Sequence, residues 1–284
     1  MEGGPEMAGA RMLRAVVLAA GSVGGLSGVA YGLLNGQSKR ARSIIGQHRD
    51  LPLNADGLYL PTGAGPFIRP KRGTLKFAVL GDSLAAGIGA ESTGRLPGVL
   101  LAKGLAEETG RPVRLCTHAV SGSKTFDLPP QVDRALIRPP DVALVIIGGN
   151  DVTSKQRVSV SAEVLGRQVS RLMAAGATVV VGTCPDLGAV APIPQPLREI
   201  ARRFSLSLAR AQQRELRRIG STAVPIADLV SPAFLARPDE LFSPDRFHPN
   251  GAGYALAASA LLPALCARVE ARVVVLSSTL PVAA

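Results

Sequence analysis

Ser83 stands at a point in the chain where a serine side chain could act as a nucleophile. It follows Gly81 and Asp82 directly after a short apolar run, and small residues come after it. A serine just past a buried strand can be exposed at the start of a helical turn, where its own backbone N–H can point at a developing oxyanion. The Gly-Asp-Ser triplet alone is weak evidence for catalysis, because it is also a common turn sequence.

The general base that such a serine requires is best sought at His248. The chain has three histidines. His48 lies in a Pro- and Gly-rich segment, and His118 is expected inside a strand, where a packed imidazole is the ordinary outcome. His248 lies in a predicted loop, and Asp245 precedes it by three residues. In a tight turn, this spacing lets the carboxylate accept a hydrogen bond from the imidazole Nδ1–H and stabilise the imidazolium. Alone, the pair would indicate only a turn aspartate and a surface histidine.

Two further loops carry groups that could stabilise an oxyanion. Gly122 follows a second predicted strand, and Asn150 follows a third. Acyl transfer needs preorganised hydrogen-bond donors around the tetrahedral oxyanion. The backbone N–H of Gly122 and the side-chain amide of Asn150 are suitable donors, and a glycine lets the backbone come close to a substrate. We expect the neighbouring Asp82 and Asp151 to be structural hydrogen-bonding residues.

The elements that must position these residues alternate along the chain. Short apolar runs predict strands, and amphipathic stretches bounded by Gly or Pro predict helices. The alternation predicts a parallel sheet with helices on both faces, in which active residues gather at the carboxyl ends of the strands. The predicted strands are residues 75–80, 113–120, 142–147, 178–181 and 222–226, and the predicted helices are residues 96–108, 131–137, 162–175, 196–219 and 252–269.

Together, these blocks resemble those of the SGNH (GDSL) hydrolase superfamily. The blocks are Gly81–Leu84, then Gly122, then Gly149–Asp151, and finally the pair of Asp245 and His248, and the resemblance covers about residues 76 to 270. The chain is especially similar to actinobacterial, membrane-associated members of this family. That similarity is carried by three stretches: Leu80–Ala90, Val181–Gly188 and Leu241–Pro249.

The resemblance implies a three-layer α/β/α, flavodoxin-like fold, here with a five-stranded parallel sheet. It also implies hydrolysis of a carboxylic ester through an acyl-enzyme on Ser83, with His248 as the base and Asp245 orienting it. Ser83, Gly122 and Asn150 would donate to the oxyanion. No metal or organic cofactor is implied. A thioesterase, a carbohydrate O-deacetylase or an acyltransferase could use the same residues, because a fold does not choose a substrate.

The N-terminal part of the chain predicts a membrane anchor and a linker. Residues 15–34 contain no charged side chain, and a helix of this length can just span a bilayer. We expect residues 1–35 to be an uncleaved anchor; the alternatives are a cleaved secretory signal and a soluble helix. The flanking basic residues weakly favour a cytoplasmic catalytic domain. Residues 36–74 are rich in Pro and Gly and predict a linker, residues 75–272 the hydrolase domain, and residues 273–284 a tail.

The net charge of +11 leaves one alternative of another class, a membrane-tethered protein that binds anionic partners through a basic surface. The basic residues are scattered, and no aromatic residues interleave with them to stack bases, so nucleic acid is not an expected partner. The expected partners are a small-molecule or lipid ester and the membrane. The three cysteines lack the spacing of metal ligands, and we expect them to be buried free thiols.

Overall fold

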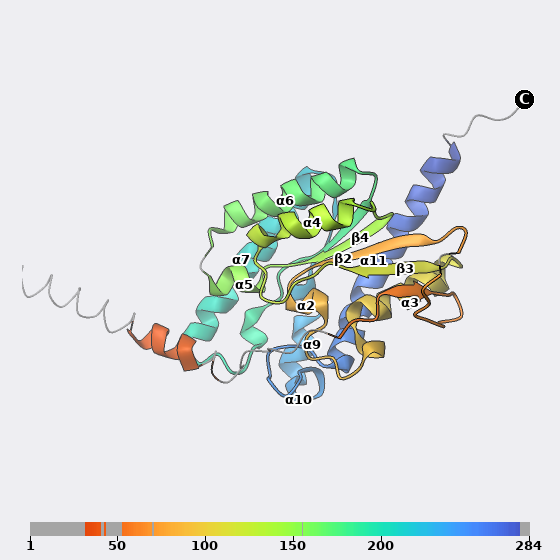
Figure 1. The fold of residues 1–284 in the computed structure, drawn as a ribbon. Helices are drawn as coiled ribbons and strands as arrows, with labels where there is room; N and C mark the ends of the chain where they lie inside the picture. The colour runs from red at the N-terminus through yellow and green to blue at the C-terminus, as the bar shows by residue number, and fades with distance from the viewer. Residues whose placement is uncertain (1–31, 41–42, 44–52, 70, 155, 279–284) are drawn as a thin grey trace, which may run out of the picture.

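A six-stranded sheet lies at the centre of the fold (Figure 1). The computed structural model describes residues 32–40, 43, 53–69, 71–154 and 156–278. The strand order is β1-β3-β2-β4-β5-β6, in which β1 runs antiparallel to β3 and all other neighbours are parallel. The strands are β1 (Gly57–Tyr59), β2 (Leu75–Gly81), β3 (Val113–Thr117), β4 (Val142–Ile146), β5 (Thr178–Gly182) and β6 (Thr222–Val224).

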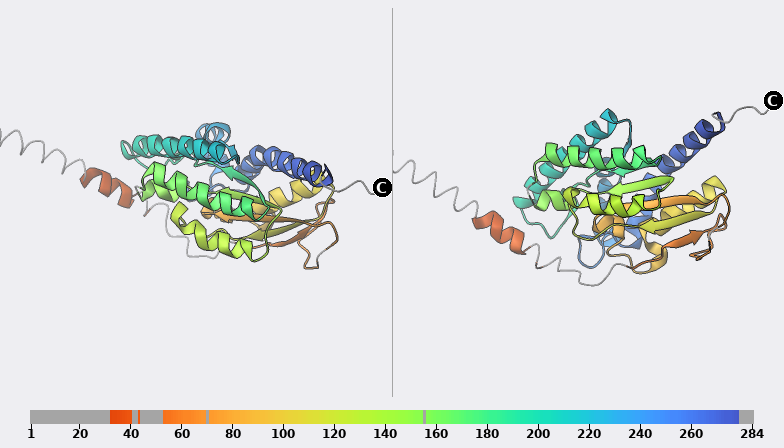
Figure 2. Two further views of the ribbon diagram at one scale, coloured as in Figure 1. Left: turned by 90° about the horizontal axis from the view of Figure 1, so that it is seen from above. Right: turned by 45° about the horizontal axis from the view of Figure 1, so that its top comes forward.

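Helices cover both faces of this sheet, which confirms the predicted three-layer α/β/α fold (Figure 1, Figure 2). One layer contains α4, α6 and α7, and the other contains α3 and α11. The long helices are α3 (Pro97–Thr109), α4 (Leu128–Leu136), α6 (Val158–Ala174), α7 (Leu197–Arg218) and α11 (Gly251–Ser278). The short ones are α2 (Ser83–Ala86), α5 (Gly149–Thr153), α8 (Ile226–Leu229), α9 (Ser231–Ala236) and α10 (Pro238–Leu241).

The side chains of β2 show why the sheet needs two helical layers. Phe77 and Val79 belong to the core cluster shared with α3 and α11, whereas Ala78 and Leu80 belong to the cluster shared with α4 and α6. Successive side chains of a strand point to opposite faces. Because both faces of β2 are apolar and buried, both must be covered, as expected for a parallel sheet.

The prediction of five strands was wrong by one, because β1 lies in the segment that predicted a linker. The strand has only three residues, including a glycine, so it carries no detectable alternation. Its pairing with β3 and a bridge between Leu58 and Phe67 make it a strand. Tyr59 is buried in the core, and its hydroxyl donates to the carbonyl of Ala55 at 2.6 Å. Part of residues 36–74 therefore belongs to the folded unit.

The predicted helices all exist, with shifted ends. Helix α4 starts three residues before its predicted start, because Pro129 and Pro130 occupy its first turn, where proline is tolerated. Helix α11 continues to Ser278, into the predicted tail. Strand β3 ends at Thr117, so His118 lies just beyond the strand. The prediction that His118 lies inside the strand was therefore wrong.

The predicted N-terminal membrane helix falls mainly outside the described residues; of that run, only residues 32–34 are described, within a helical segment of residues 32–40. In the described part, one helix is long and apolar enough to span a membrane, judged by length and composition alone. It is the Gly251–Ala271 portion of α11, near the C-terminus rather than the N-terminus. Leu261, Leu265 and Val269 of this helix are buried in the core beside the sheet.

Gly81 controls how β2 leaves the sheet. Its φ angle is +137°, a backbone conformation that residues other than glycine rarely adopt. A Cβ atom at this position would collide with the carbonyl group of Ile146 in β4. The end of β2 therefore lies directly against β4, and the chain turns from there into Asp82 and Ser83.

We expect Gly81→Ala to lower the free energy of unfolding by about 3 kcal/mol or more, because the added methyl group meets backbone that cannot move aside. Urea denaturation followed by circular dichroism measures this loss. Gly94→Ala is the matched control, since a Cβ there meets nothing within 4 Å, and its effect should stay within about 0.5 kcal/mol. Equal effects of the two substitutions would contradict the constraint at Gly81.

Candidate active site

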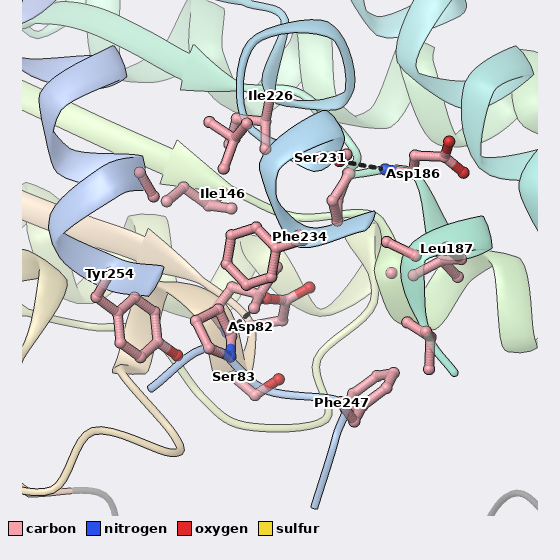
Figure 3. Close-up of a pocket in the computed structure, with 18 of the residues that line it drawn as sticks. Asp82, Ser83, Ile146, Asp186, Leu187, Ile226, Ser231, Phe234, Phe247 and Tyr254 are labelled. Carbon is pink, nitrogen blue, oxygen red and sulfur yellow. Dashed lines mark hydrogen bonds between the residues drawn. The ribbon is translucent and has the colours of Figure 1, made fainter. Parts of the chain in front are cut away.

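Ser83 begins helix α2, separated from the end of β2 by one residue, and hydrogen bonds at both ends hold this short helix in place. Asp82 caps it, because its Oδ1 accepts the N–H of Leu84 at 3.0 Å. At the other end, the N–H of Gly87 donates to the carbonyl of Ser83 at 3.0 Å. The Ser83 side chain therefore projects from a turn whose backbone is held on either side, at the edge of a cavity (Figure 3).

The imidazole of His248 joins Ser83 to Asp245. Its Nε2 lies 3.0 Å from Ser83 Oγ, and its Nδ1 lies 2.6 Å from Asp245 Oδ2. An ionised carboxylate can only accept hydrogen bonds, so we assign the ring proton to Nδ1, which leaves Nε2 to accept the hydrogen of the serine hydroxyl. All three side chains are largely buried. The structure thus brings Ser83, from one block of the sequence, together with the pair of Asp245 and His248 from another.

The loop between α10 and α11 folds around the carboxylate of Asp245. Its Oδ1 accepts the Ser243 hydroxyl at 2.7 Å, the Phe247 N–H at 2.8 Å and the His248 N–H at 2.9 Å. Arg246 has a φ angle of +54°, a conformation uncommon outside glycine. This turn brings the chain back, so that the two N–H groups that follow it face the carboxylate.

The same contacts settle the charge of Asp245. Burial by itself disfavours the ionised form, but the hydrogen bonds from the His248 ring, from the backbone N–H groups of Phe247 and His248, and from Ser243 outweigh it. They hold the pKa of this carboxyl well below its usual range. An ionised aspartate at this position can stabilise a positively charged imidazole.

Asp82 and Asp151 have the structural contacts expected from the sequence. Asp151 accepts the N–H of Thr125 at 3.0 Å and the hydroxyl of Ser161 at 2.8 Å, and so ties together segments that lie on either side of it. Burial raises the pKa of Asp82 to about 7, and the nearby charge of Asp151 adds to the effect, while backbone hydrogen bonds oppose it.

The loops that carry Gly122 and Asn150 begin at the same edge of the sheet as Ser83. The N–H of Val120 donates to the end of β2 at 3.1 Å, which places the start of the Gly122 loop beside that strand. The Asn150 amide donates to the carbonyl of Ser123 at 3.0 Å. Asn150 lines the same cavity as Ser83, whereas Gly122 lines a separate groove.

Sequence reasoning missed two buried glutamines that hold the strand ends. Gln131 of α4 accepts the N–H of Gly81 at 2.8 Å, and its amide donates to the carbonyl of Gly81 at 2.9 Å and to Ser123 Oγ at 3.1 Å. Gln212 of α7 makes the corresponding bonds just beyond the ends of β4 and β5. The signal was available, since both glutamines lie on the apolar faces of amphipathic helices.

A largely apolar cavity of about 90 Å³ lies beside Ser83 (Figure 3). Its walls come from the end of β4 and from α8, α9 and α11, with Ile146, Ile226 and Phe234 among them. Asp186 lies at its edge, in the loop after β5, where its Oδ1 accepts the N–H of Gly188 at 2.7 Å. The backbone N–H of Asp186 donates to the hydroxyl of Ser231 at 3.2 Å, the contact marked by a dashed line in Figure 3.

The cysteines and the other side chains that could bind a metal ion lie apart from one another. Within the described residues, no group of three or more His, Cys, Asp or Glu side chains is placed to hold a metal ion. The cysteines are free, but Cys116 is exposed and Cys266 is only partly buried, so the prediction of buried thiols holds for Cys184 alone. Burial raises the pKa of the Cys184 thiol well above its ordinary value, with nearby carboxylates adding to the effect.

Comparison with known proteins places this geometry in context. Residues 79–256 match the model of the GDSL-like lipase/acylhydrolase family. A GDSL-like esterase of Mycobacterium tuberculosis is 43% identical over 265 residues, which are 89% of this chain and 84% of that protein. The fold is similar to that of an α/β hydrolase from the Lake Arreo metagenome (TM-score 0.56, 23% identity, covering 68% of this chain and 95% of the other). It is also similar to that of a lipase/acylhydrolase from Enterococcus faecalis (TM-score 0.53, 21% identity, covering 68% and 96%).

The raised pKa of Asp82 predicts that the protein loses stability as the pH rises from about 4 to 7. In the unfolded chain this carboxyl ionises near pH 4, whereas in the folded chain it ionises near pH 7, so the folded state binds the proton more tightly. Asp82→Asn keeps an acceptor for Leu84 and never ionises. We expect the free energy of unfolding of this variant to gain about 4 kcal/mol on the wild type between pH 4 and pH 8.

Denaturation curves across this pH range measure the gain. Asp228→Asn, which removes a carboxylate from an exposed position, controls for the loss of one negative charge. A difference between Asp82→Asn and the wild type that stays constant with pH would refute the raised pKa.

Proposed function

Because the chain belongs to the GDSL-like lipase/acylhydrolase family and is an ester hydrolase, we propose that it cleaves its substrate through an acyl-enzyme on Ser83. The observation that carries this proposal is the chain of hydrogen bonds from Asp245 through His248 to Ser83. A serine hydroxyl is a weak nucleophile until an adjacent base takes its proton. The imidazole Nε2, 3.0 Å from Oγ, is within reach to do so.

In the proposed first step, Ser83 Oγ bonds to the ester carbonyl carbon while its proton passes to His248 Nε2. The ionised Asp245 stabilises the imidazolium that forms. When the tetrahedral intermediate collapses, the carbon–oxygen bond to the alcohol breaks, and His248 returns the proton to the departing oxygen. Water then attacks the acyl-enzyme in the same way, with His248 as its base, and releases the carboxylic acid and free Ser83.

We propose that the backbone N–H groups of Ser83 and Gly122 and the amide of Asn150 bind the oxyanion. Among the described residues, no acceptor takes the N–H of Ser83 or of Gly122. An amide nitrogen carries two hydrogens, so the bond from Asn150 to Ser123 leaves one for the substrate. Donors held in place before the reaction stabilise the developing charge without reorganisation.

The substrate we propose is a carboxylic ester. The Mycobacterium tuberculosis relative is named as an esterase, and it matches most of this chain. The same residues could also cleave a thioester or an ester of a sugar, because the chemistry at the carbonyl carbon is the same. An assay in which a carboxylic ester, a thioester and a sugar ester compete for the enzyme measures which of them it prefers.

We expect Ser83→Ala and His248→Ala each to lower kcat for p-nitrophenyl ester hydrolysis by about 10⁴-fold or more, since each removes one half of the nucleophile and base pair. Asn150→Ala should lower kcat by about 10²- to 10³-fold, because it removes one oxyanion donor and leaves the nucleophile in place. Full-length protein in mild detergent is the material for these assays.

Ser92→Ala is the matched control for the serine substitution. This exposed serine makes no side-chain capping bond, so its loss should leave kcat within about twofold of the wild type. Activity that survives in Ser83→Ala would disprove the assignment of the nucleophile.

We further propose that residues 15–34 attach the protein to a membrane, with secretion after signal cleavage as the alternative. The uncharged run supports attachment by its length. We expect the full-length chain, at its full mass, in the membrane fraction of expressing cells, and a chain lacking residues 1–35 in the soluble fraction. A mature chain shortened by about 30 residues would indicate signal cleavage. A truncated chain that stays with the membrane would point to α11 instead.

A further inference from the structure

The helical segment of residues 32–40 is bonded to the domain at the end where Ser83 lies. Its first three residues are the last of the uncharged run 15–34, and it lies beside the start of α7 (Figure 1). We propose that this end of the molecule docks on the membrane surface, so that the candidate active site faces the lipid layer. The inference rests on the proposed hydrolysis at Ser83 and the proposed attachment through residues 15–34, and it adds an interaction surface to them.

The side chain of Gln37 fixes the helical segment to the domain. Its Nε2 donates to the carbonyl of Gln195 at 2.6 Å, and its Oε1 accepts the N–H of Leu197 at 3.2 Å. Because the same amide both donates and accepts, its orientation is set. A helix rises about 1.5 Å per residue, so the uncharged run ends at Leu34, about 5 Å from Gln37 along the helix. A run that enters the bilayer therefore holds the turn at Gln195 close to the lipid surface.

The turn that Gln37 binds belongs to the rim of the candidate active site. It ends the loop after β5, and Leu187 of that loop lines the cavity beside Ser83. Leu197 and Phe247 both pack against the core cluster that contains Leu187. Phe247 also lines the cavity (Figure 3). The helical segment is therefore attached to a part of the chain that borders the site, and not to a remote surface.

Half-exposed apolar side chains gather at the same end of the molecule. In a parallel sheet, the segments that follow the strands begin at one edge, where the carboxyl ends meet. Single exposed apolar residues are common, but here the segments after β3, β5 and β6 each contribute at least one. Side chains of this kind can insert into the headgroup region of a membrane. They are 45% to 56% exposed: Val120, Phe126, Ile200, Leu229 and Leu235.

The charges beside the helical segment suit an anionic lipid surface. Lys39 and Arg40 are exposed at its end, and Glu199, in the first turn of α7, is paired with Arg203 at 2.7 Å. Each basic residue near a surface of anionic lipids strengthens binding by up to about fivefold. A second copy of the chain could cover the apolar side chains, but it offers nothing to the uncharged run or to the basic residues. A lipid surface accommodates all three.

Docking in this orientation changes which esters reach Ser83 most readily. An ester held in the lipid layer meets the site at the high effective concentration of a shared surface. An ester dissolved in water has no such advantage. The enzyme should therefore prefer an ester in the membrane to which it is attached, and the preference should depend on the bridge made by Gln37.

Tryptophan fluorescence measures the docking directly, because the chain contains no tryptophan. Ile200→Trp, in full-length protein reconstituted in vesicles of phosphatidylcholine and phosphatidylglycerol, places one probe at the proposed interface. Brominated phosphatidylcholine should quench its emission by about half or more, since interfacial side chains reach the acyl boundary. Ile137→Trp makes the same change on an exposed isoleucine at the opposite end of the sheet, where α4 ends. Its emission should stay unquenched.

The quenching experiment has outcomes that overturn the proposal. One is a probe at position 200 that lipid does not quench, whether it lies in water or under a second copy of the chain. Another is equal quenching at positions 200 and 137. Leu229→Trp is a second probe, should the larger ring at position 200 disturb the contact with the helical segment. Protein that does not sediment with the vesicles overturns attachment and docking together, whereas sedimentation with unquenched probes overturns docking alone.

Gln37→Ala tests the bridge. The variant keeps residues 15–34 and should still sediment with the vesicles, but it loses the two bonds that hold the site at the surface. We compare hydrolysis of p-nitrophenyl palmitate in vesicles with that of p-nitrophenyl acetate in solution, and expect the ratio to fall at least about fivefold. Asn35→Ala, at an exposed position of the same segment, is the matched control and should keep the ratio. An unchanged ratio in Gln37→Ala would overturn the proposal.

Ser83→Ala in the Ile200→Trp background separates the docking from the proposed mechanism. The probe should remain quenched by brominated lipid while hydrolysis of both esters is lost. If the probe is quenched but this variant still hydrolyses esters, the mechanism is wrong and the docking stands. If hydrolysis requires Ser83 but the probe is not quenched, the mechanism stands and the docking is wrong.

Discussion

The close approach of β2 to β4 at their carboxyl ends is the constraint on which the site depends. Gly81 lies so near the carbonyl of Ile146 that no side chain fits between them, and Gln131 bonds both backbone polar groups of Gly81. These contacts fix the direction in which the backbone continues from Gly81 into Asp82. Asp82 then caps a short helix whose first residue is Ser83. The packing of the sheet therefore sets the position of the proposed nucleophile.

The proposed base, His248, comes from the C-terminal part of the chain, and its own loop orients it beside Ser83. Asp245 takes hydrogen bonds from its own loop through one carboxylate oxygen and offers the other to His248. The loop thus fixes the carboxylate before any substrate arrives. Preorganisation of this kind means that little rearrangement is needed when the imidazole becomes charged. The left-handed backbone at Arg246 is the local strain that makes the turn possible.

The helices that cover the sheet near the site serve two roles. Phe234 and Leu261 belong to the core cluster that holds α9 and α11 on the sheet, and the same side chains line the cavity beside Ser83. The packing of the core and the walls of this cavity therefore share atoms. A substitution in this wall that changes the shape of the cavity also changes the packing of the fold, because a tightly packed interior responds to the loss or gain of a single methylene group.

The sequence by itself determined the layers of the fold and the residues that could do the chemistry. Apolar strands alternating with amphipathic helices require a sheet covered on both faces, and Ser83, Asn150 and His248 follow predicted strands or precede the last helix. Strand β1 could not be predicted, because three residues carry no periodic pattern and long-range pairing with β3 makes the strand. Gln131 and Gln212 could be noticed as polar residues on apolar helix faces, but their partners could not be predicted, because these bonds join segments far apart in the sequence. Tertiary structure alone decided the distances within the site and the cavity beside Ser83, since both arise where segments far apart in the sequence pack together.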